Sequence, residues 1–327
     1  MKVLIAHQSL LRLSRVKHRV MALIDDVDMR EAATLTDTYH LAEHAEPHCV
    51  IIAEELAEQP EFELLASLFR IMEISCIVMT DGPDATHIHP IFPDIRVVPD
   101  HALEDAIRQT AKLVPPAPNA SAPDKKPAHD VDTYDPERLI LIGASTGGID
   151  ALLTVTRHFD HQSPPVMIVQ HTGGSFAKSL IRLLDGASPA KVTAAADGMP
   201  LSPGHVYLAP DDQAHLAIAP RRKPHIALQQ DAAVSGHRPS VDALSSSAVP
   251  QAAKVSAALL TGMGKDGAAG LTKLRQAGAY TIGQDRKTSV VYGMPRIAKE
   301  MGGVCAQLPI HQIGLALLKS CKVKQSA

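Results

Sequence analysis

The sequence predicts a two-domain α/β protein from its length, its alternating pattern and one segment of distinct composition. The chain has 327 residues, which suggests two domains at about 150 residues each. Short runs that are apolar throughout alternate with helical patterns, as is typical of parallel strands covered by helices on both faces. Residues 114–137 are rich in Pro, Ala and Asp, so we expect a semi-extended linker between the domains.

The first domain, residues 1–113, alternates predicted strands with predicted helices, which implies βαβ units and a parallel sheet. The predicted strands are Lys2–Ala6, Cys49–Ala53, Cys76–Met79 and Arg96–Val98. The predicted helices are Leu10–Leu23, Ala32–His44, Glu61–Met72 and Ala102–Leu113.

The second domain, residues 138–327, is expected to form a doubly wound, mostly parallel sheet. Its predicted strands are Leu139–Ala144, Val166–Gln170, Ser256–Thr261 and Tyr280–Gly283. Helices are marked by apolar residues at helical spacing, namely Ile149, Leu152 and Leu153, then Phe176, Leu180, Leu183 and Leu184. The segment Val206–Ala219 has two apolar runs around Pro210, and this pattern predicts a β-hairpin.

Composition excludes several classes of function. The 32 Lys and Arg residues against 35 Asp and Glu give a net charge of −3, which argues against a nucleic-acid partner. The four cysteines show no C-x-x-C spacing, so neither a disulfide framework nor a thiolate metal site is expected. No signal-peptide layout is present, and no stretch approaches the roughly 20 apolar residues that span a bilayer. We therefore expect a cytoplasmic protein without membrane insertion.

Ser145 lies in a pattern that can expose a nucleophile. Residues 143–147 read Gly-Ala-Ser-Thr-Gly between a predicted strand and a predicted helix, which is the setting of a nucleophile elbow. The glycines permit a sharp turn, and free N–H groups of the following helix could stabilise an oxyanion. A glycine turn without catalytic function gives the same pattern, so the serine also needs a base.

Two further reactive side chains follow other predicted strands. His171 comes directly after Val166–Gln170, and Asp266 follows Ser256–Thr261. Because the carboxyl ends of parallel strands share one edge of a sheet, we expect these side chains to meet Ser145 there. Ser145 would attack, His171 would transfer the proton and Asp266 would orient the imidazole. The chain order of Ser, His and Asp differs from that of α/β-hydrolases, which indicates another hydrolase scaffold.

A dinucleotide-binding site is the competing interpretation of the loop that contains Asp266. Residues 262–267 fit G-x-G-x-x-G after a predicted strand, and Asp285 lies near the end of the next strand, where a ribose-binding acid would stand. Asp266, however, would place a carboxylate in a loop that must hold a pyrophosphate. This hypothesis also leaves Ser145 and His171 without a function.

Residues 138–317 resemble the catalytic domain of CheB-type protein-glutamate methylesterases. The resemblance rests on the blocks LIGASTGGIDAL, VMIVQHTGGSFAKSLIRLLD, VYLAPDDQAHL, GHRPSVDAL and ALLTGMGKDGAAGLTKLRQAGAYTIGQD, in that order. It implies that Ser145, His171 and Asp266 form the family's triad, without a cofactor or a metal. It also implies oxyanion donors from the backbone amides around Thr146 and Met263, and it places His237 close to the triad.

The same resemblance implies a reaction and a partner. The implied reaction is hydrolysis of glutamate γ-methyl esters on the cytoplasmic helices of methyl-accepting chemoreceptors, within a chemosensory pathway. Receptor glutamines could be deamidated by the same acyl-enzyme route.

A receiver domain of (βα)5 type is implied for residues 1–113, but the residues that its chemistry needs are missing. The positions of the acidic pair, the phosphoacceptor, the threonine and the lysine read Ala6-His7, Ala53, Thr80 and Val98, and only Thr80 keeps the expected type. Without a Mg²⁺ site or an acceptor carboxylate, we expect a pseudo-receiver that is not phosphorylated. It would contact the catalytic domain or other chemosensory signalling proteins, and Glu54 and Glu55 are candidates for fixed negative charge.

A protein of another class would give much of the same pattern. A catalytically silent adaptor descended from such enzymes could keep the fold and lose the reaction. The substitution Ser145→Ala distinguishes the two, because only an enzyme loses methanol release with its nucleophile.

Overall fold

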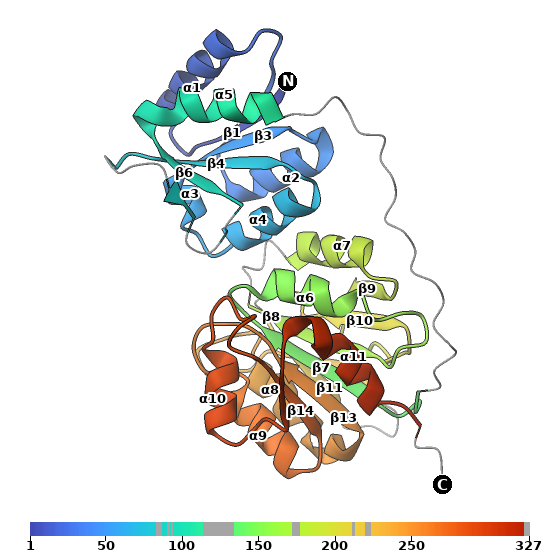
Figure 1. The fold of residues 1–327 in the computed structure, drawn as a ribbon. Coiled ribbons are helices and arrows are strands. Elements are labelled where there is room, and N and C mark those ends of the chain that lie inside the picture. Colours follow the sequence, from blue (N-terminus) through green and yellow to red (C-terminus); the bar gives the residue numbers. More distant parts are fainter. Residues whose placement is uncertain are drawn as a thin grey trace. The chain divides into compact units, whose positions relative to one another are not determined.

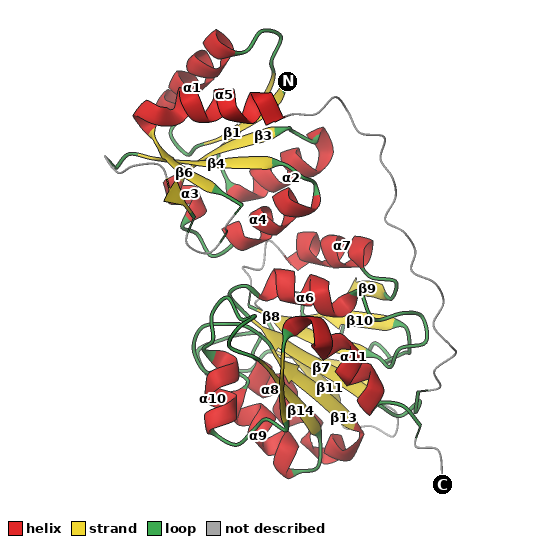
Figure 2. Cartoon of the chain, viewed as in Figure 1, coloured by secondary structure: helices red, strands yellow, loops and turns green. Residues whose placement is uncertain are grey.

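The structure, a computed structural model, describes residues 1–82, 87–89, 92, 94–113, 134–171, 177–210, 213–219 and 224–323. The chain divides into two compact units, Met1–Pro127 and Ala128–Ala327. Most of the predicted linker, up to residue 133, lies outside the described residues. Both units combine helices with mostly parallel sheets (Figure 1, Figure 2), which confirms the predicted fold class.

The first unit contains a six-stranded sheet of order β2-β1-β3-β4-β6-β5, in which only β5 runs antiparallel to its neighbour. The strands are β1 (Lys2–Ala6), β2 (Asp28–Ala32), β3 (Cys49–Ala53), β4 (Ser75–Thr80), β5 (His87–Ile88) and β6 (Arg96–Pro99). The helices are α1 (Leu10–Leu23), α2 (Leu35–Ala45), α3 (Glu54–Ala57), α4 (Phe62–Ile71) and α5 (Leu103–Leu113). Helices α1 and α5 pack on one face of the sheet, where Val3, Ile5 and Ile51 are buried.

The predicted helix Ala32–His44 begins too early, because Ala32 ends strand β2 and the helix starts at Leu35. Thr34 sets this start, since its side chain accepts a hydrogen bond from the Asp37 N–H at 3.1 Å. Strand β2 lies at the sheet edge with four of its five residues partly or fully exposed. An exposed edge strand of this kind has no regular apolar pattern, so it could not be predicted from the sequence.

The second unit is built on a seven-stranded parallel sheet of order β15-β14-β13-β7-β8-β10-β9. The strands are β7 (Leu139–Ala144), β8 (Val166–Gln170), β9 (Lys191–Ala194), β10 (His205–Leu208), β13 (Val255–Leu259), β14 (Tyr280–Gln284) and β15 (Ala306–Leu308). The α-helices are α6 (Gly148–Thr156), α7 (Ala177–Ala187), α8 (Val241–Ala248), α9 (Ala268–Gln276), α10 (Met294–Glu300) and α11 (Ile310–Ser320).

The predicted hairpin at Val206–Ala219 is wrong. Its first run is β10, which pairs in parallel with β8 and β9. Its second run is β11 (His215–Ala219), which pairs antiparallel with β12 (His225–Gln229) in a separate two-stranded sheet. The prediction failed because a local turn signal does not identify the partner of either strand beside it.

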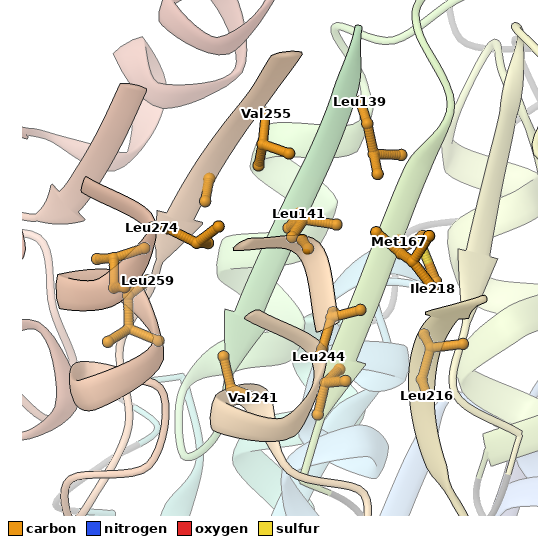
Figure 3. Close-up of a cluster of buried hydrophobic side chains, with 14 of the residues drawn as sticks. Leu139, Leu141, Met167, Leu216, Ile218, Val241, Leu244, Val255, Leu259 and Leu274 are labelled. Carbon is orange, nitrogen blue, oxygen red and sulfur yellow. The ribbon is translucent and has the colours of Figure 1, made fainter. Parts of the chain in front are cut away.

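Helices cover both faces of the seven-stranded sheet, as the doubly wound fold requires. Helices α6 and α11 contact one face (Figure 1), and α8, α9 and the β11–β12 pair contact the other. Figure 3 shows the second interface, whose buried cluster includes Leu141, Met167 and Leu259 of the sheet and Leu244 of α8. Among the residues that the structure describes, no helix is long and apolar enough to cross a membrane.

Candidate active site

Strands β7, β8 and β13 lie side by side and bring three predicted residues to one edge of the sheet. The register pairs Ala144 with Gln170, so that Ser145 and His171 leave the sheet next to each other. The His171 N–H donates to the Ala144 carbonyl at 3.1 Å. On the other side of β7, the Ser145 N–H donates to the carbonyl of Thr261, just beyond β13, at 3.0 Å. This is the point where the chain reverses its direction across the sheet, the usual position of a site in such folds.

Glycines make the close approach of these loops possible. Gly147 has φ +75, and a Cβ added to it would lie 2.4 Å from Cβ of Val290. A Cβ on Gly262 would lie 2.7 Å from Cβ of Ser145. Neither position can therefore hold a larger residue without moving its neighbour.

Two backbone amides beside Ser145 remain available for a ligand. The N–H groups of Thr146 and Met263 donate to no other described residue. Thr146 is held in place, because its carbonyl accepts a hydrogen bond from the Thr261 hydroxyl at 2.9 Å. The Met263 side chain is 68% exposed, so it lies at the surface of the site and not in the core.

Asp266 and His171 form a buried hydrogen-bonded pair. Nε2 of His171 lies 2.9 Å from Oδ2 of Asp266, whose side chain has no exposed surface. Because a carboxylate only accepts, Nε2 carries the proton, and Nδ1 of the neutral ring is left as the basic nitrogen. Nδ1 is buried and has no hydrogen-bond partner among the described residues. The imidazole is thus prepared to accept one proton.

Asp266 is also held by the N-terminus of α8. Its oxygens accept hydrogen bonds from the Ser240 hydroxyl at 2.7 Å, and from the backbone N–H groups of Val241 and Asp242 at 2.8 and 3.1 Å. Burial raises the pKa of Asp266, but the hydrogen bonds from His171, Ser240 and the two amides outweigh burial and hold the pKa below its usual value. Asp266 is therefore ionised at neutral pH.

His237 covers the imidazole of His171. The two rings are stacked, with centroids 3.8 Å apart and planes inclined by 4°. Burial, followed by the proximity of His171, lowers the pKa of His237. A neutral ring therefore lies against His171 and restricts its rotation.

Sequence reasoning missed the residues that support Asp266. Ser240 is the N-cap of α8, and its hydroxyl accepts from the Ala243 N–H at 3.2 Å. A serine before an apolar helical run is a recognisable cap signal, but the pattern does not tell which carboxylate the hydroxyl contacts. Asp242 accepts hydrogen bonds from Gly270 N–H at 2.6 Å and from the Ser235 hydroxyl at 2.8 Å.

The geometry does not favour the dinucleotide interpretation. Asp266 is directed at α8 and His171. Oδ1 of Asp285 accepts from the N–H and the hydroxyl of Thr288, at 3.0 and 2.6 Å. Both carboxylates are therefore used within the protein.

At the carboxyl edge of the first unit's sheet, His7 and Thr80 lie close to several carboxylates. This proximity could not be predicted from the sequence. A cavity of about 80 Å³ there is lined by His7, Arg12, Ala53, Glu54, Glu55, Glu58, Met79 and Asp81. The Thr80 hydroxyl donates to Glu54 at 2.5 Å, and Arg12 is paired with Asp81. Burial lowers the pKa of His7, against an opposing effect of Glu55.

These residues do not fit a Mg²⁺ site. Ala6 and Ala53 offer no side-chain oxygen, and Val98 lies on β6 where a lysine would be needed for a phosphate. Nδ1 of His7 accepts the Ser9 N–H at 3.1 Å, so Nε2 carries the proton in the neutral ring and cannot bind a metal. Within the described ranges, no group of three or more His, Cys, Asp or Glu side chains could hold a metal ion.

A serine, a histidine and a buried aspartate at the carboxyl edge of a parallel sheet are the arrangement of a serine hydrolase. Comparison with known proteins identifies the family, since a family model described as CheB methylesterase matches residues 140–317. The chain belongs to the CheB methylesterase family, and it is a hydrolase.

Individual relatives agree with this assignment. A protein-glutamate methylesterase/protein-glutamine glutaminase of Agrobacterium fabrum is 37% identical over 293 residues, covering 84% of this chain and 83% of the relative. A similarly named protein of Rhizobium johnstonii is 46% identical over 183 residues, covering 56% of this chain and 53% of the relative. The crystal structure of the Thermotoga maritima CheB methylesterase catalytic domain matches 56% of this chain and 97% of that one, with 36% identity and a TM-score of 0.54.

Proposed function

We propose that this protein hydrolyses glutamate γ-methyl esters on the cytoplasmic helices of methyl-accepting chemoreceptors, as a cytoplasmic enzyme of a chemosensory pathway. The observation that carries the proposal is the 2.9 Å hydrogen bond between His171 and the fully buried Asp266, at the sheet edge where Ser145 leaves β7. The names of the relatives, which specify protein-glutamate methylesterase activity, support the substrate class.

In this mechanism the Ser145 hydroxyl attacks the ester carbonyl while Nδ1 of His171 takes its proton. The negative charge on the carbonyl oxygen is stabilised by the amides of Thr146 and Met263, which have no other described acceptor. The tetrahedral intermediate collapses, methanol leaves with the proton from His171, and an acyl-enzyme remains. Water, deprotonated by His171, then cleaves the acyl-enzyme and releases a glutamate carboxylate.

Asp266 stabilises the imidazolium that forms in each step, because its carboxylate is ionised and hydrogen-bonded to Nε2. His237, stacked on the ring of His171, restricts the rotation of that ring. A receptor glutamine would react by the same route with ammonia as the leaving group, in line with the glutaminase part of the relatives' names.

Methanol release from membranes that carry methylated receptors tests the proposal. We expect Ser145→Ala to abolish release while the variant keeps the thermal stability of the parent. Undiminished release by this variant would contradict the assigned nucleophile. Receptor binding without any methanol release by the parent would instead indicate a catalytically silent adaptor.

For the first unit, we propose a pseudo-receiver that is not phosphorylated and acts through protein contacts. Ala53 supplies no acceptor carboxylate, and the hydroxyl of Thr80 is already bound by Glu54. Incubation of the full chain with acetyl phosphate and Mg²⁺ should leave its intact mass unchanged. Stoichiometric, hydroxylamine-sensitive phosphorylation within residues 1–113 would refute this proposal.

A further inference from the structure

One buried histidine outside the triad connects both ends of the loop that carries His237. His215 of β11 is only 1% exposed. Its Nδ1 accepts the backbone N–H of Ser240 at 3.1 Å, and its Nε2–H donates to the carbonyl of Ala232 at 3.0 Å. We call residues 232–240 the His237 loop. A single imidazole therefore fixes where this loop begins and where it ends.

Inside the His237 loop, the turn is tight. Val234 and His237 exchange two backbone hydrogen bonds of 3.0 Å. Between them, Ser235 and Gly236 have φ values of 54 and 83, as in the two-residue turns of β-hairpins. The tip thus has little freedom of its own, and its position depends on the ends that His215 holds.

Two residues of the His237 loop contact the triad. His237 stacks on His171 at 3.8 Å, and the hydroxyl of Ser240 donates to Asp266 at 2.7 Å. Ser240 is completely buried, so its backbone N–H would lose its acceptor if Nδ1 of His215 were removed. An unpaired buried N–H would drive the loop end to move.

We propose that His215 is a positioning residue for the hydrolytic reaction, because it holds Ser240 and His237 where they orient the Asp266–His171 pair. This inference rests on the proposed function, since it requires that Ser145, His171 and Asp266 perform the reaction.

Three substitutions separate the two hydrogen bonds of His215. The amide oxygen of Asn can replace Nδ1 as the acceptor for the Ser240 N–H, whereas the amide nitrogen of Gln can replace Nε2 as the donor to Ala232. Phe keeps the volume of the ring and removes both bonds. The inference therefore predicts that kcat falls in the order parent, His215→Asn, His215→Gln, His215→Phe.

Methanol release by the full-length variants measures this order. We expect His215→Phe to lower kcat by about 10- to 100-fold, because small displacements of reacting groups have effects of this size, with KM changed less than about twofold. The low-field NMR signal of the His171 Nε2 proton should shift in the same order. If His215→Phe does not fold, the comparison of Asn with Gln decides.

Two controls complete the experiment. Ile226→Ala, on the neighbouring strand β12, is the matched control. Ile226 is 1% exposed and forms no hydrogen bond with the described residues of the His237 loop. The substitution should lower stability and leave kcat unchanged. An unchanged kcat in His215→Phe, a Gln variant at least as active as the Asn variant, or an equal loss in Ile226→Ala would overturn the inference. Ser145→Ala, assayed alongside, distinguishes the two proposals. Activity in Ser145→Ala would refute the proposed function and the inference with it, whereas an inactive Ser145→Ala together with an unchanged kcat in His215→Phe would refute the inference alone.

Discussion

Asp242 and Asp266 are neighbouring buried carboxylates whose pKa values move in opposite directions. Burial raises the pKa of both, but in Asp266 the hydrogen bonds, first that of His171, outweigh it. In Asp242 burial prevails over the hydrogen bonds from Gly270 and Ser235, with a further contribution from the charge of Asp266, so its pKa is raised. Asp266 is thus favoured in its ionised form, whereas ionisation of the neighbouring Asp242 is disfavoured.

The raised pKa of Asp242 makes a prediction about stability. A carboxyl group whose pKa is higher in the folded state stabilises the fold at low pH, and this stability is lost as the pH rises through the folded-state pKa. Asn at position 242 can keep the acceptor for Gly270 N–H and has no such titration. We expect Asp242→Asn to melt about 2–4 °C higher than the parent at pH 7, with no gain at pH 3. Calorimetry at both pH values checks this, and a gain at pH 3 alone would contradict it.

The pKa of Asp266 shifts in the opposite direction, so its contribution to stability depends on pH in the opposite way. Because its pKa is lowered in the folded state, its stabilising contribution is present above its ordinary pKa and is lost as the pH falls through the lowered value. In Asp266→Asn, this acid-dependent loss should disappear. The rate of methanol release at neutral pH should fall by about 10³–10⁴-fold, because the histidine loses its orienting anion. A loss of less than tenfold in a folded variant would show that Asp266 does not act on His171.

Gly147 offers a test of the turn at Ser145. Gly147→Ala places a Cβ in a left-handed conformation and 2.4 Å from Cβ of Val290, and we expect a loss of stability of about 1–3 kcal/mol together with reduced methanol release. Gly198→Ala is the matched control, since Gly198 has φ +74 with no atom within 4 Å of the added Cβ. Equal effects of the two substitutions would mean that the contact with Val290 is unimportant.

At the scale of elements, the sequence was sufficient wherever burial imposed a pattern. Central strands such as β1, β3, β7 and β13 are buried along most of their length and were predicted within about two residues. The edge strand β2 and the partner of β11 could not be predicted, because edge strands lack the pattern and pairing is a long-range property.

The same distinction applies to the site. Ser145, His171 and Asp266 could be predicted to lie at one edge of the sheet, because each follows a recognisable strand and parallel strands end at the same edge. His215 could not, since its contacts with Ala232 and Ser240 join residues 17 and 25 positions away, through backbone groups that leave no mark on the sequence.

The cysteines of β3 and β4 report on the stability of the first unit. Burial raises the pKa of Cys49 to about 12 and that of Cys76 well above its usual value, while Cys305 of the second unit is exposed. At pH 8, we expect iodoacetamide to label Cys49 and Cys76 at least about 100-fold more slowly than Cys305, since labelling needs local unfolding. Peptide mass spectrometry gives the three rates. Comparable rates would show that β3 and β4 open readily.

For the whole molecule, the location of the site's contacts has a consequence for regulation. Every hydrogen bond given above for Ser145, His171 and Asp266 joins residues of the second unit. Residues 138–327 alone should therefore hydrolyse methylated receptors. In the first unit, Ala53 ends β3 without a carboxylate, and no metal-binding group of three or more His, Cys, Asp or Glu side chains occurs among the residues that the structure describes.

The ratio of full-chain to fragment activity should then be independent of phosphate. We expect acetyl phosphate with Mg²⁺ to leave methanol release by the full chain within about twofold of its untreated rate, since no aspartate stands at the end of β3 to accept the phosphoryl group. Without acetyl phosphate, a ratio below one would mean that the first unit inhibits the second by contact. A ratio near one would mean that the first unit binds another partner instead. Activation of the full chain by acetyl phosphate, absent from the fragment, would mean that a different residue of the first unit receives the phosphate and that the missing acceptor at Ala53 has been replaced.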